Sequence, residues 1–152
     1  MNTKQRTIIK DFIVVTAVTF VTVLAMICLK GRVNRLEATR AMDQLGKIVL
    51  AYRQQYGAVP PESYILNIKG DLPGAVRLGE IYYRARWLEF DAGDDEILAC
   101  SIKTYRSLSG NKFIVLKLNG DVQLIKPQQL QALLDQQQTP QEKIQGRRDF
   151  LP

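Results

Sequence analysis

Few side chains in this sequence are suited to acid–base, nucleophilic or metal chemistry. Histidine is absent, which removes the commonest general base and the commonest neutral metal ligand. The two cysteines, Cys28 and Cys100, stand far apart, so no CxxC pair offers a thiolate zinc site or a redox dithiol. The sequence contains no GxSxG motif and no phosphate-binding glycine loop. We therefore expect no catalytic residue, no cofactor and a protein that is not an enzyme.

The densest group of carboxylates is the stretch DAGDDE at residues 91–96. Asp91, Asp94, Asp95 and Glu96 offer oxygen atoms of the kind that bind calcium, but their spacing does not match an EF-hand loop. Carboxylates between two strands are usually solvated, so we favour a solvated loop and predict no metal site. Glu89 and Asp91 form a pair of the kind used in acid–base catalysis, but the sequence implies no pocket around them.

Residues 80–90, EIYYRARWLEF, alternate between two sets of side chains and predict a strand. The set expected to face the core is Ile81, Tyr83, Ala85 and Trp87. The other set, Tyr82, Arg84 and Arg86, forms either an exposed recognition strip or an ordinary solvent face. We favour the ordinary solvent face.

The elements that carry these residues begin with an apolar segment. Residues 12–29, FIVVTAVTFVTVLAMICL, hold no charged side chain over 18 positions, about the minimum for a transmembrane helix. Thr16, Thr19 and Thr22 fit such a helix because their hydroxyls can bond to the carbonyl one turn earlier. No small-x-small cleavage site follows, so we expect the segment to remain as an anchor. A Cys28–Cys100 disulfide is not expected, since Cys28 lies inside the apolar run.

The net charge of +6 is concentrated around this segment. Residues 1–40 carry seven basic and two acidic side chains, whereas the remaining 112 residues carry 14 basic and 13 acidic ones. Lysine and arginine at the ends of a membrane helix contact lipid headgroups. We therefore predict membrane lipid as a partner and no nucleic acid. Both flanks are basic, so charge hardly fixes the orientation; we favour residues 1–11 as a short cytoplasmic tail.

Residues 30–57 predict an amphipathic helix that continues the membrane helix. One stripe of it is apolar or aromatic, and its members are Ala41, Leu45, Ile48, Val49, Tyr52 and Tyr56. Tyr52 and Tyr56 are expected to pack against a sheet rather than to bind a ligand. Gly31 and Gly46 are the expected places for a bend. Gly57 then closes the helix, and Pro60-Pro61 prevent its continuation.

Residues 58–135 predict a small domain built on an antiparallel sheet. Residues 62–79 are expected to form a loop with a short extended piece, YILNIK. Strands are expected at 80–90, at 98–104 and in KFIVLKL and DVQLI, the last two joined at Asn119-Gly120 by a type I′ turn. Pro127 opens a short helix with three leucines on one side, and residues 136–152 are expected to be a flexible, glutamine-rich tail. The predicted fold is thus α+β: a long helix packed on a four-stranded antiparallel sheet, with a short C-terminal helix.

This order of elements resembles type II secretion pseudopilins and type IV pilin-like proteins. The resemblance rests on the apolar helix, the helix end "IVLAYRQQYGAVPP" and the later stretch "FIVLKLNGDVQLIKPQQLQALL". It covers about residues 12–134 as an architectural pattern. It implies a globular domain on the periplasmic or extracellular side of the inner membrane, and a long helix that packs against other pilin-like subunits or secretion-assembly proteins.

The start of the apolar run departs from the prepilin pattern. Prepilins usually carry glycine and then Phe-Thr-Leu-Ile-Glu there, whereas this sequence has Asp11 in place of the glycine and Thr16 in place of the glutamate. Processing by the prepilin peptidase is therefore not expected. We predict a non-enzymatic, single-pass structural or accessory subunit of a type II secretion or pilus-like assembly. The alternative is a membrane-tethered periplasmic binding module that forms no filaments.

Overall fold

The structure is a computed structural model that describes residues 3–88, 92–107 and 109–144. The chain divides into two compact units, Met1–Val33 and Asn34–Pro152. The helix α1 (Thr3–Tyr56) contributes to both units, and its end at Tyr56 agrees with the sequence prediction. Residues 3–11, which precede the apolar run, are also helical. Gly57 follows with φ of +69°, a conformation that closes a helix.

The second unit is an α+β domain, as predicted. After α1 its helices are α2 (Glu62–Lys69), α3 (Ala75–Leu78), the 3-10 turn η1 (Ala85–Trp87) and α4 (Pro127–Gln137). Its strands are β1 (Ile81–Tyr83), β2 (Ile97–Ser101), β3 (Tyr105–Ser107), β4 (Gly110–Lys117) and β5 (Val122–Ile125). The described chain thus has five strands rather than the predicted four, because β3 forms a separate short pairing with the start of β4.

Strand β4 is the centre of the antiparallel sheet. Both β2 and β5 pair with its residues Val115 and Leu116, so these two strands flank β4 on opposite edges. Strand β1 adds to the outer edge of β2. The register shifts between Ile97 and Ala99, which marks a β-bulge. This bulge lets Leu98 and Ala99 join one core while Ile97 and Cys100 join the other.

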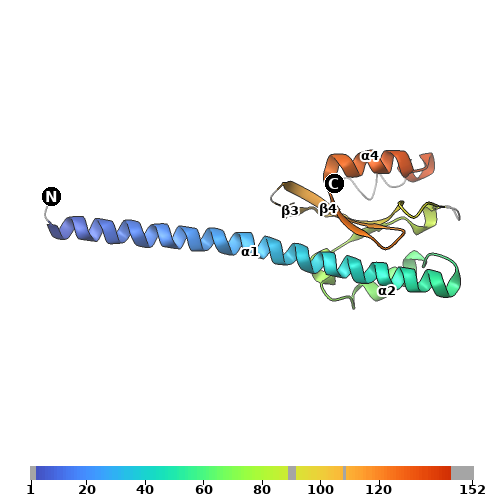
Figure 1. The fold of residues 1–152 in the computed structure, drawn as a ribbon, viewed down its shortest axis with the longest axis horizontal. Coiled ribbons are helices and arrows are strands. Elements are labelled where there is room, and N and C mark those ends of the chain that lie inside the picture. The colour runs from blue at the N-terminus through green and yellow to red at the C-terminus, as the bar shows by residue number, and fades with distance from the viewer. Residues whose placement is uncertain (1–2, 89–91, 108, 145–152) are drawn as a thin grey trace. The chain divides into compact units, whose positions relative to one another are not determined.

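Both faces of the sheet are covered by helices (Figure 1). On one face lie the fully buried side chains of one stripe of α1: Ala38, Ala41, Met42, Leu45 and Val49. On the other face, Leu130 and Leu134 of α4 pack against Cys100, Val115 and Ile125. The sheet is therefore apolar on both faces, because α4 covers the second one.

Two sequence predictions about local structure are wrong. Residues 62–69 form the helix α2 rather than an extended piece, and its Ile65 is buried in the main core. The hairpin turn at Asn119-Gly120 is not of type I′, because only Gly120 of this pair has positive φ. The Gly120 amide bonds the Lys117 carbonyl and the Lys117 amide bonds the Asp121 carbonyl, a type I turn closed by a glycine bulge.

The predicted strand over residues 80–90 is also shorter than expected. Only Ile81–Tyr83 is strand, and η1 follows it directly. Trp87 is half-buried and belongs to neither core cluster, whereas we had expected it in the core. The guanidinium carbon of Arg86 lies 4.7 Å from the centre of the Trp87 ring. A cation–π contact of this kind suits a ring at the domain surface.

Gly46 and Gly120 allow the β4–β5 turn to approach α1 closely. A Cβ atom on Gly46 would lie 2.8 Å from Leu116 Cδ1 and 3.1 Å from the Gly120 carbonyl oxygen. A Cβ atom on Gly120 would meet the side chain of Leu50. Gly46 is therefore a packing residue at the helix–hairpin contact and not the bend that the sequence suggested.

Candidate functional site

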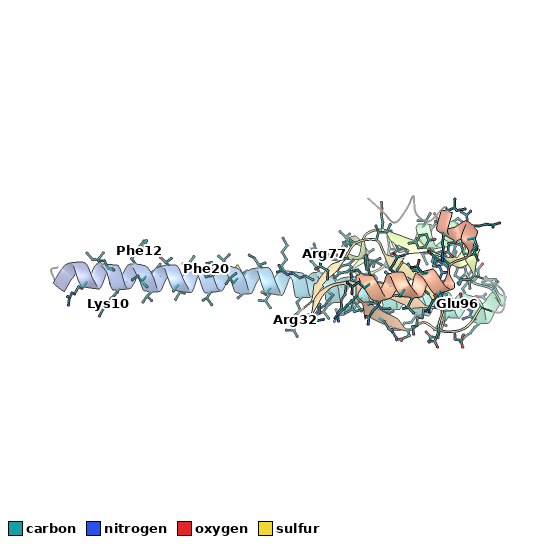
Figure 2. The ribbon with its side chains drawn as sticks, turned by 90° about the horizontal axis from the view of Figure 1, so that it is seen from above. Lys10, Phe12, Phe20, Arg32, Arg77 and Glu96 are labelled. Atoms are coloured by element: carbon teal, nitrogen blue, oxygen red, sulfur yellow. The ribbon has the colours of Figure 1, made fainter. Side chains whose placement is uncertain are left out.

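The apolar segment of α1 is the largest exposed hydrophobic surface that the structure describes. Among the described residues, one helix is long and apolar enough to span a membrane, and its most apolar stretch is not buried. Its exposed side chains include Leu29 and also Phe12 and Phe20, which Figure 2 labels. Such a surface is compatible with a transmembrane segment.

The hydroxyl groups inside this segment are satisfied by the helix itself. Thr16, Thr19 and Thr22 each donate a 2.8 Å hydrogen bond to the carbonyl four residues earlier, which confirms the prediction. Because these bonds leave no unpaired hydroxyl donor, the threonines are compatible with a lipid environment. Their spacing of three also gathers them along one side of the helix.

The proposed solvent strip of Tyr82, Arg84 and Arg86 does not exist as predicted. Arg84 is fully buried and Tyr82 is 8% exposed; only Arg86 is exposed. The prediction is wrong because β1 ends at Tyr83, so the alternation of side chains along a strand does not continue to Arg84. Arg84 instead turns into the domain, where charged groups are rare unless they are paired.

A buried ion pair accounts for this position. Arg84 Nε lies 2.6 Å from Glu142 Oε1, and Arg84 Nη2 lies 3.0 Å from Glu142 Oε2, a bidentate arrangement. The remaining guanidinium donors bond the Ile97 carbonyl and Gln137. Tyr82 donates a further hydrogen bond of 3.0 Å to Glu142, and burial together with this carboxylate raises the pKa of Tyr82. The network fastens the C-terminal segment to β1 and β2.

The prediction of a flexible tail over residues 136–152 is therefore wrong over residues 136–144; residues 145–152 lie outside the described part of the chain. Residues 140–144 are helical. Thr139 begins this turn, since its hydroxyl accepts a bond from the Glu142 amide and its carbonyl accepts one from the Lys143 amide. The sequence TPQE at 139–142 is a capping signal with proline at the first helical position, and it could have predicted the turn.

The described part of the acidic loop gathers no metal-ligand cluster. Asp95 pairs with Lys117 at 3.0 Å, and Asp94 lies 3.9 Å from Arg53. Within residues 3–88, 92–107 and 109–144, no group of three or more acidic, cysteine or histidine side chains could hold a metal ion. Asp91 and Glu89 lie outside the described residues, so the acid–base pair that they would form is not described either.

Tyr52 and Tyr56 form an aromatic cluster with Tyr64 of α2. The ring centres of Tyr52 and Tyr56 are 4.4 Å apart, and those of Tyr52 and Tyr64 are 5.2 Å apart. Tyr56 is 61% exposed. The C-terminal part of α1 therefore contacts α2 through the rings of Tyr52 and Tyr64.

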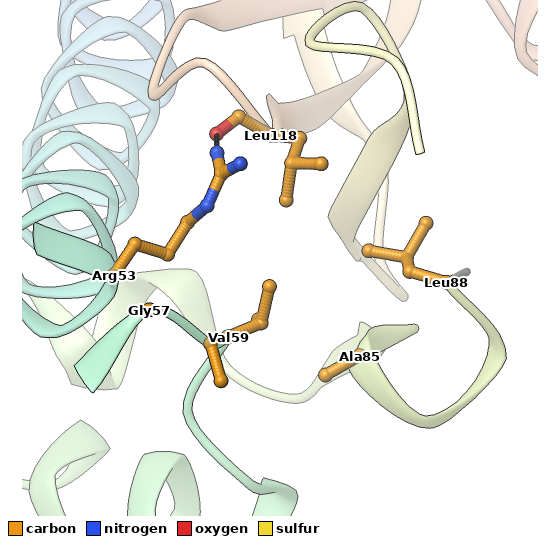
Figure 3. Close-up of a pocket in the computed structure, with 7 residues that line it drawn as sticks. Arg53, Gly57, Val59, Ala85, Leu88 and Leu118 are labelled. Atoms are coloured by element: carbon orange, nitrogen blue, oxygen red, sulfur yellow. Dashed lines mark hydrogen bonds between the residues drawn. The ribbon is translucent and has the colours of Figure 1, made fainter. Parts of the chain in front are cut away.

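A cavity of about 280 Å³ opens beside the C-terminal end of α1 (Figure 3). Its apolar wall consists of Val59, Ala85, Leu88 and Leu118, and Arg53 supplies its charge. Arg53 is already engaged, since its Nη1 donates a 2.9 Å hydrogen bond to the Leu118 carbonyl. No motif in the sequence indicated this cavity, because its lining comes from four separate segments.

The cysteines are unpaired, as the sequence predicted. Cys28 is exposed on the apolar segment and Cys100 is buried in the sheet. Burial raises the pKa of the Cys100 thiol to about 12. A thiol that stays protonated at neutral pH is a poor nucleophile and a poor metal ligand, so Cys100 acts as a core residue.

Comparisons with known proteins give no match. No family model matches this sequence, and neither a curated protein nor a solved structure matches it.

Proposed function

We propose that this protein is a membrane-anchored, non-enzymatic structural or accessory subunit of a type II secretion or pilus-like assembly. In this proposal the apolar segment lies in the inner membrane, and the α+β domain lies on its periplasmic or extracellular side. The long helix α1 would pack laterally against equivalent helices of other pilin-like subunits or of secretion-assembly proteins.

The observation that carries the proposal is the dual use of α1. The same helix holds an exposed, uncharged stretch over residues 12–29 and a fully buried stripe from Ala38 to Val49. A helix that only tethers a domain has no need to form its core. In the proposed role, α1 makes the assembly contacts and also forms part of the core of the domain, so one continuous helix serves both purposes.

Disulfide cross-linking along the apolar segment tests this proposal. Single cysteines are introduced by Thr19→Cys and by Val21→Cys in a Cys28→Ser background, and native membranes are oxidised with copper phenanthroline. Cys100 stays in place because it is buried. Positions 19 and 21 are about 200° apart around a helix. We expect cross-linked adducts at Thr19, on the threonine side, at a yield several-fold higher than at Val21.

Lys47→Cys serves as the collision control, since the Lys47 side chain is 72% exposed on the α+β domain. Equal yields at Thr19, Val21 and Lys47 would reflect random encounters and would contradict the proposal. Absence of adducts at every position along residues 12–29 would also contradict it.

The cavity beside Arg53 favours a second candidate function, a membrane-tethered module that binds a soluble partner or small ligand. Its apolar wall and single cation are typical of a modest binding site. This candidate predicts monomers throughout the cross-linking experiment. It is the weaker candidate because the cation of the cavity is already bonded to a backbone carbonyl.

A further inference from the structure

A group of basic side chains lies at the end of the α+β unit where its part of α1 begins. We define the basic cluster as Arg35, Arg77, Lys103, Arg106 and Lys112. Arg77 marks this end in Figure 2. The cluster comes from α1, α3, the β2–β3 connection, β3 and β4, so it is assembled by the fold and is not a run in the sequence.

Hydrogen bonds, a cation–ring contact and strand pairing connect the members of the basic cluster. Arg35 Nη1 donates a 3.2 Å hydrogen bond to the Arg106 carbonyl. Lys103 Nζ lies 5.5 Å from the ring centre of Tyr105, whose hydroxyl lies 2.8 Å from the Arg77 carbonyl oxygen. Tyr105 in turn pairs with Lys112 across the β3–β4 ladder. Partial burial and the neighbouring charge of Arg77 lower the pKa of Lys103, which agrees with two cations lying close together.

The charge of the basic cluster is only partly neutralised. Glu37 Oε2 lies 3.3 Å from Arg77 Nε, and Glu80 is a further acidic residue, two positions after α3. Lys103 and Arg106 are exposed, and neither forms an ion pair with another residue that the structure describes. Val76, beside Arg77 on α3, is 88% exposed. An exposed apolar side chain among cations is the combination that binds the interface of an anionic bilayer.

Chain length limits the distance between Arg35 and the end of the apolar run. Arg35 is six positions after Leu29, the last residue of the apolar run. Even a fully extended chain of six residues spans at most about 21 Å, and a helix spans about 9 Å. A bilayer entered at Leu29 therefore lies within reach of the domain surface that carries Arg35.

We propose that the basic cluster, together with Val76, is a membrane-contact surface that binds the anionic phospholipid headgroups of the bilayer in which residues 12–29 are anchored. This contact would hold the α+β domain against the membrane surface. The proposal depends on anchoring in a bilayer and not on the assembly role, so either proposal can fail without the other.

The experiment uses the full chain in nanodiscs, labelled with an environment-sensitive fluorophore at Val76→Cys in the Cys28→Ser background. One nanodisc preparation contains phosphatidylcholine alone and the other contains 30% phosphatidylglycerol. We expect a blue-shifted emission and at least a twofold rise in intensity with phosphatidylglycerol only. This signal should disappear in 1 M NaCl, where the Debye length falls to about 3 Å.

Charge-matched variants identify the surface. Arg77→Gln, Lys103→Gln and Arg106→Gln together should abolish the lipid-dependent signal. The double variant Lys103→Gln, Arg106→Gln, which leaves the Arg77–Glu37 pair intact, should weaken the signal at least twofold without a change in near-UV circular dichroism. The control removes three cations elsewhere in the domain, by Lys47→Gln, Lys126→Gln and Lys143→Gln, and should keep the signal.

Equal emission in both lipid compositions would overturn the proposal, as would an equal loss of signal in the control variant. Nucleic acid is the competing partner for a basic surface. Displacement of the signal by an oligonucleotide at lower concentration than by phosphatidylglycerol vesicles would also overturn it.

Discussion

At Arg84, one guanidinium makes five hydrogen bonds in a site from which water is excluded. Its partner Glu142 is also fully buried, and the carboxylate accepts a third bond from Tyr82. Every buried side-chain nitrogen and oxygen that the structure describes has a hydrogen-bond partner. A network this complete stabilises one position of the C-terminal segment, because any other position leaves a charge buried and unpaired.

Removal of either Arg84 or Glu142 alone should therefore strongly destabilise the domain. Glu142→Ala leaves the Arg84 guanidinium buried without its carboxylate, and we expect a loss of about 3–5 kcal/mol in the free energy of unfolding. Thermal unfolding of the full chain in detergent, followed by near-UV circular dichroism, measures this loss. Gln141→Ala, at the exposed neighbour, is the control and should change little. The double variant Arg84→Met, Glu142→Leu should regain much of the loss, and failure to do so would contradict the assigned cause.

At the scale of elements, the contact between α1 and the β4–β5 turn depends on the absence of side chains. Gly46 and Gly120 face each other there, and each would clash if it carried a Cβ atom. By contrast, Gly31 has nothing within 4 Å of a Cβ atom and tolerates one. The two glycines of α1 look equivalent in sequence, and only their surroundings distinguish them.

We expect Gly46→Ala to lower stability and Gly31→Ala to raise it or leave it unchanged. Alanine improves helix propensity by up to about 1 kcal/mol at either site. At position 46 the clash with Leu116 and Gly120 outweighs this gain, for a net loss of about 1–2 kcal/mol. At position 31 the gain should remain or stability should stay unchanged. Thermal unfolding of the two variants side by side measures the difference. Equal effects would show that the close approach at Gly46 does not affect stability.

At the scale of the whole molecule, each of the two cores on either side of the sheet contains buried groups that can lose a proton, namely tyrosine hydroxyls and a cysteine thiol. Tyr82 and Cys100 lie in the core under α4, and Tyr83 and Tyr105 lie in the core under α1. Burial raises the pKa of each of these groups above its usual value, and for Tyr82 the charge of Glu142 adds to the effect. The folding stability of the domain should therefore depend on pH in the alkaline range.

The direction of this linkage follows from proton binding. Above about pH 9–10 the unfolded chain releases these protons while the folded chain retains them, so folding stability falls as pH rises. We expect the melting temperature to be steady from pH 7 to 9 and then to decrease. Tyr82→Phe should make the decrease less steep, and Tyr56→Phe, at a 61% exposed tyrosine, should not. A constant melting temperature up to pH 11 would contradict the prediction.

The sequence by itself determined the features that depend on neighbouring residues. The uncharged run at 12–29, the helix end at Tyr56-Gly57, the α4 helix after Pro127 and the β4–β5 hairpin all followed from local periodicity and turn residues. Helices and hairpins of this kind are specified within a few residues, so their signals survive without knowledge of the fold.

Only the tertiary structure decided the features that depend on distant partners. Residues 62–69 are too few for their apolar pattern to decide between strand and helix, and in the fold Ile65 of α2 packs in the core with α1. The sequence pattern predicted that Arg84 is exposed. In the structure it is buried, because Glu142, 58 residues later, provides its counter-charge. The basic cluster likewise exists only because β3 and α3 meet beside Arg35. Burial, charge pairing and surface charge arise from long-range contacts, which local patterns do not encode.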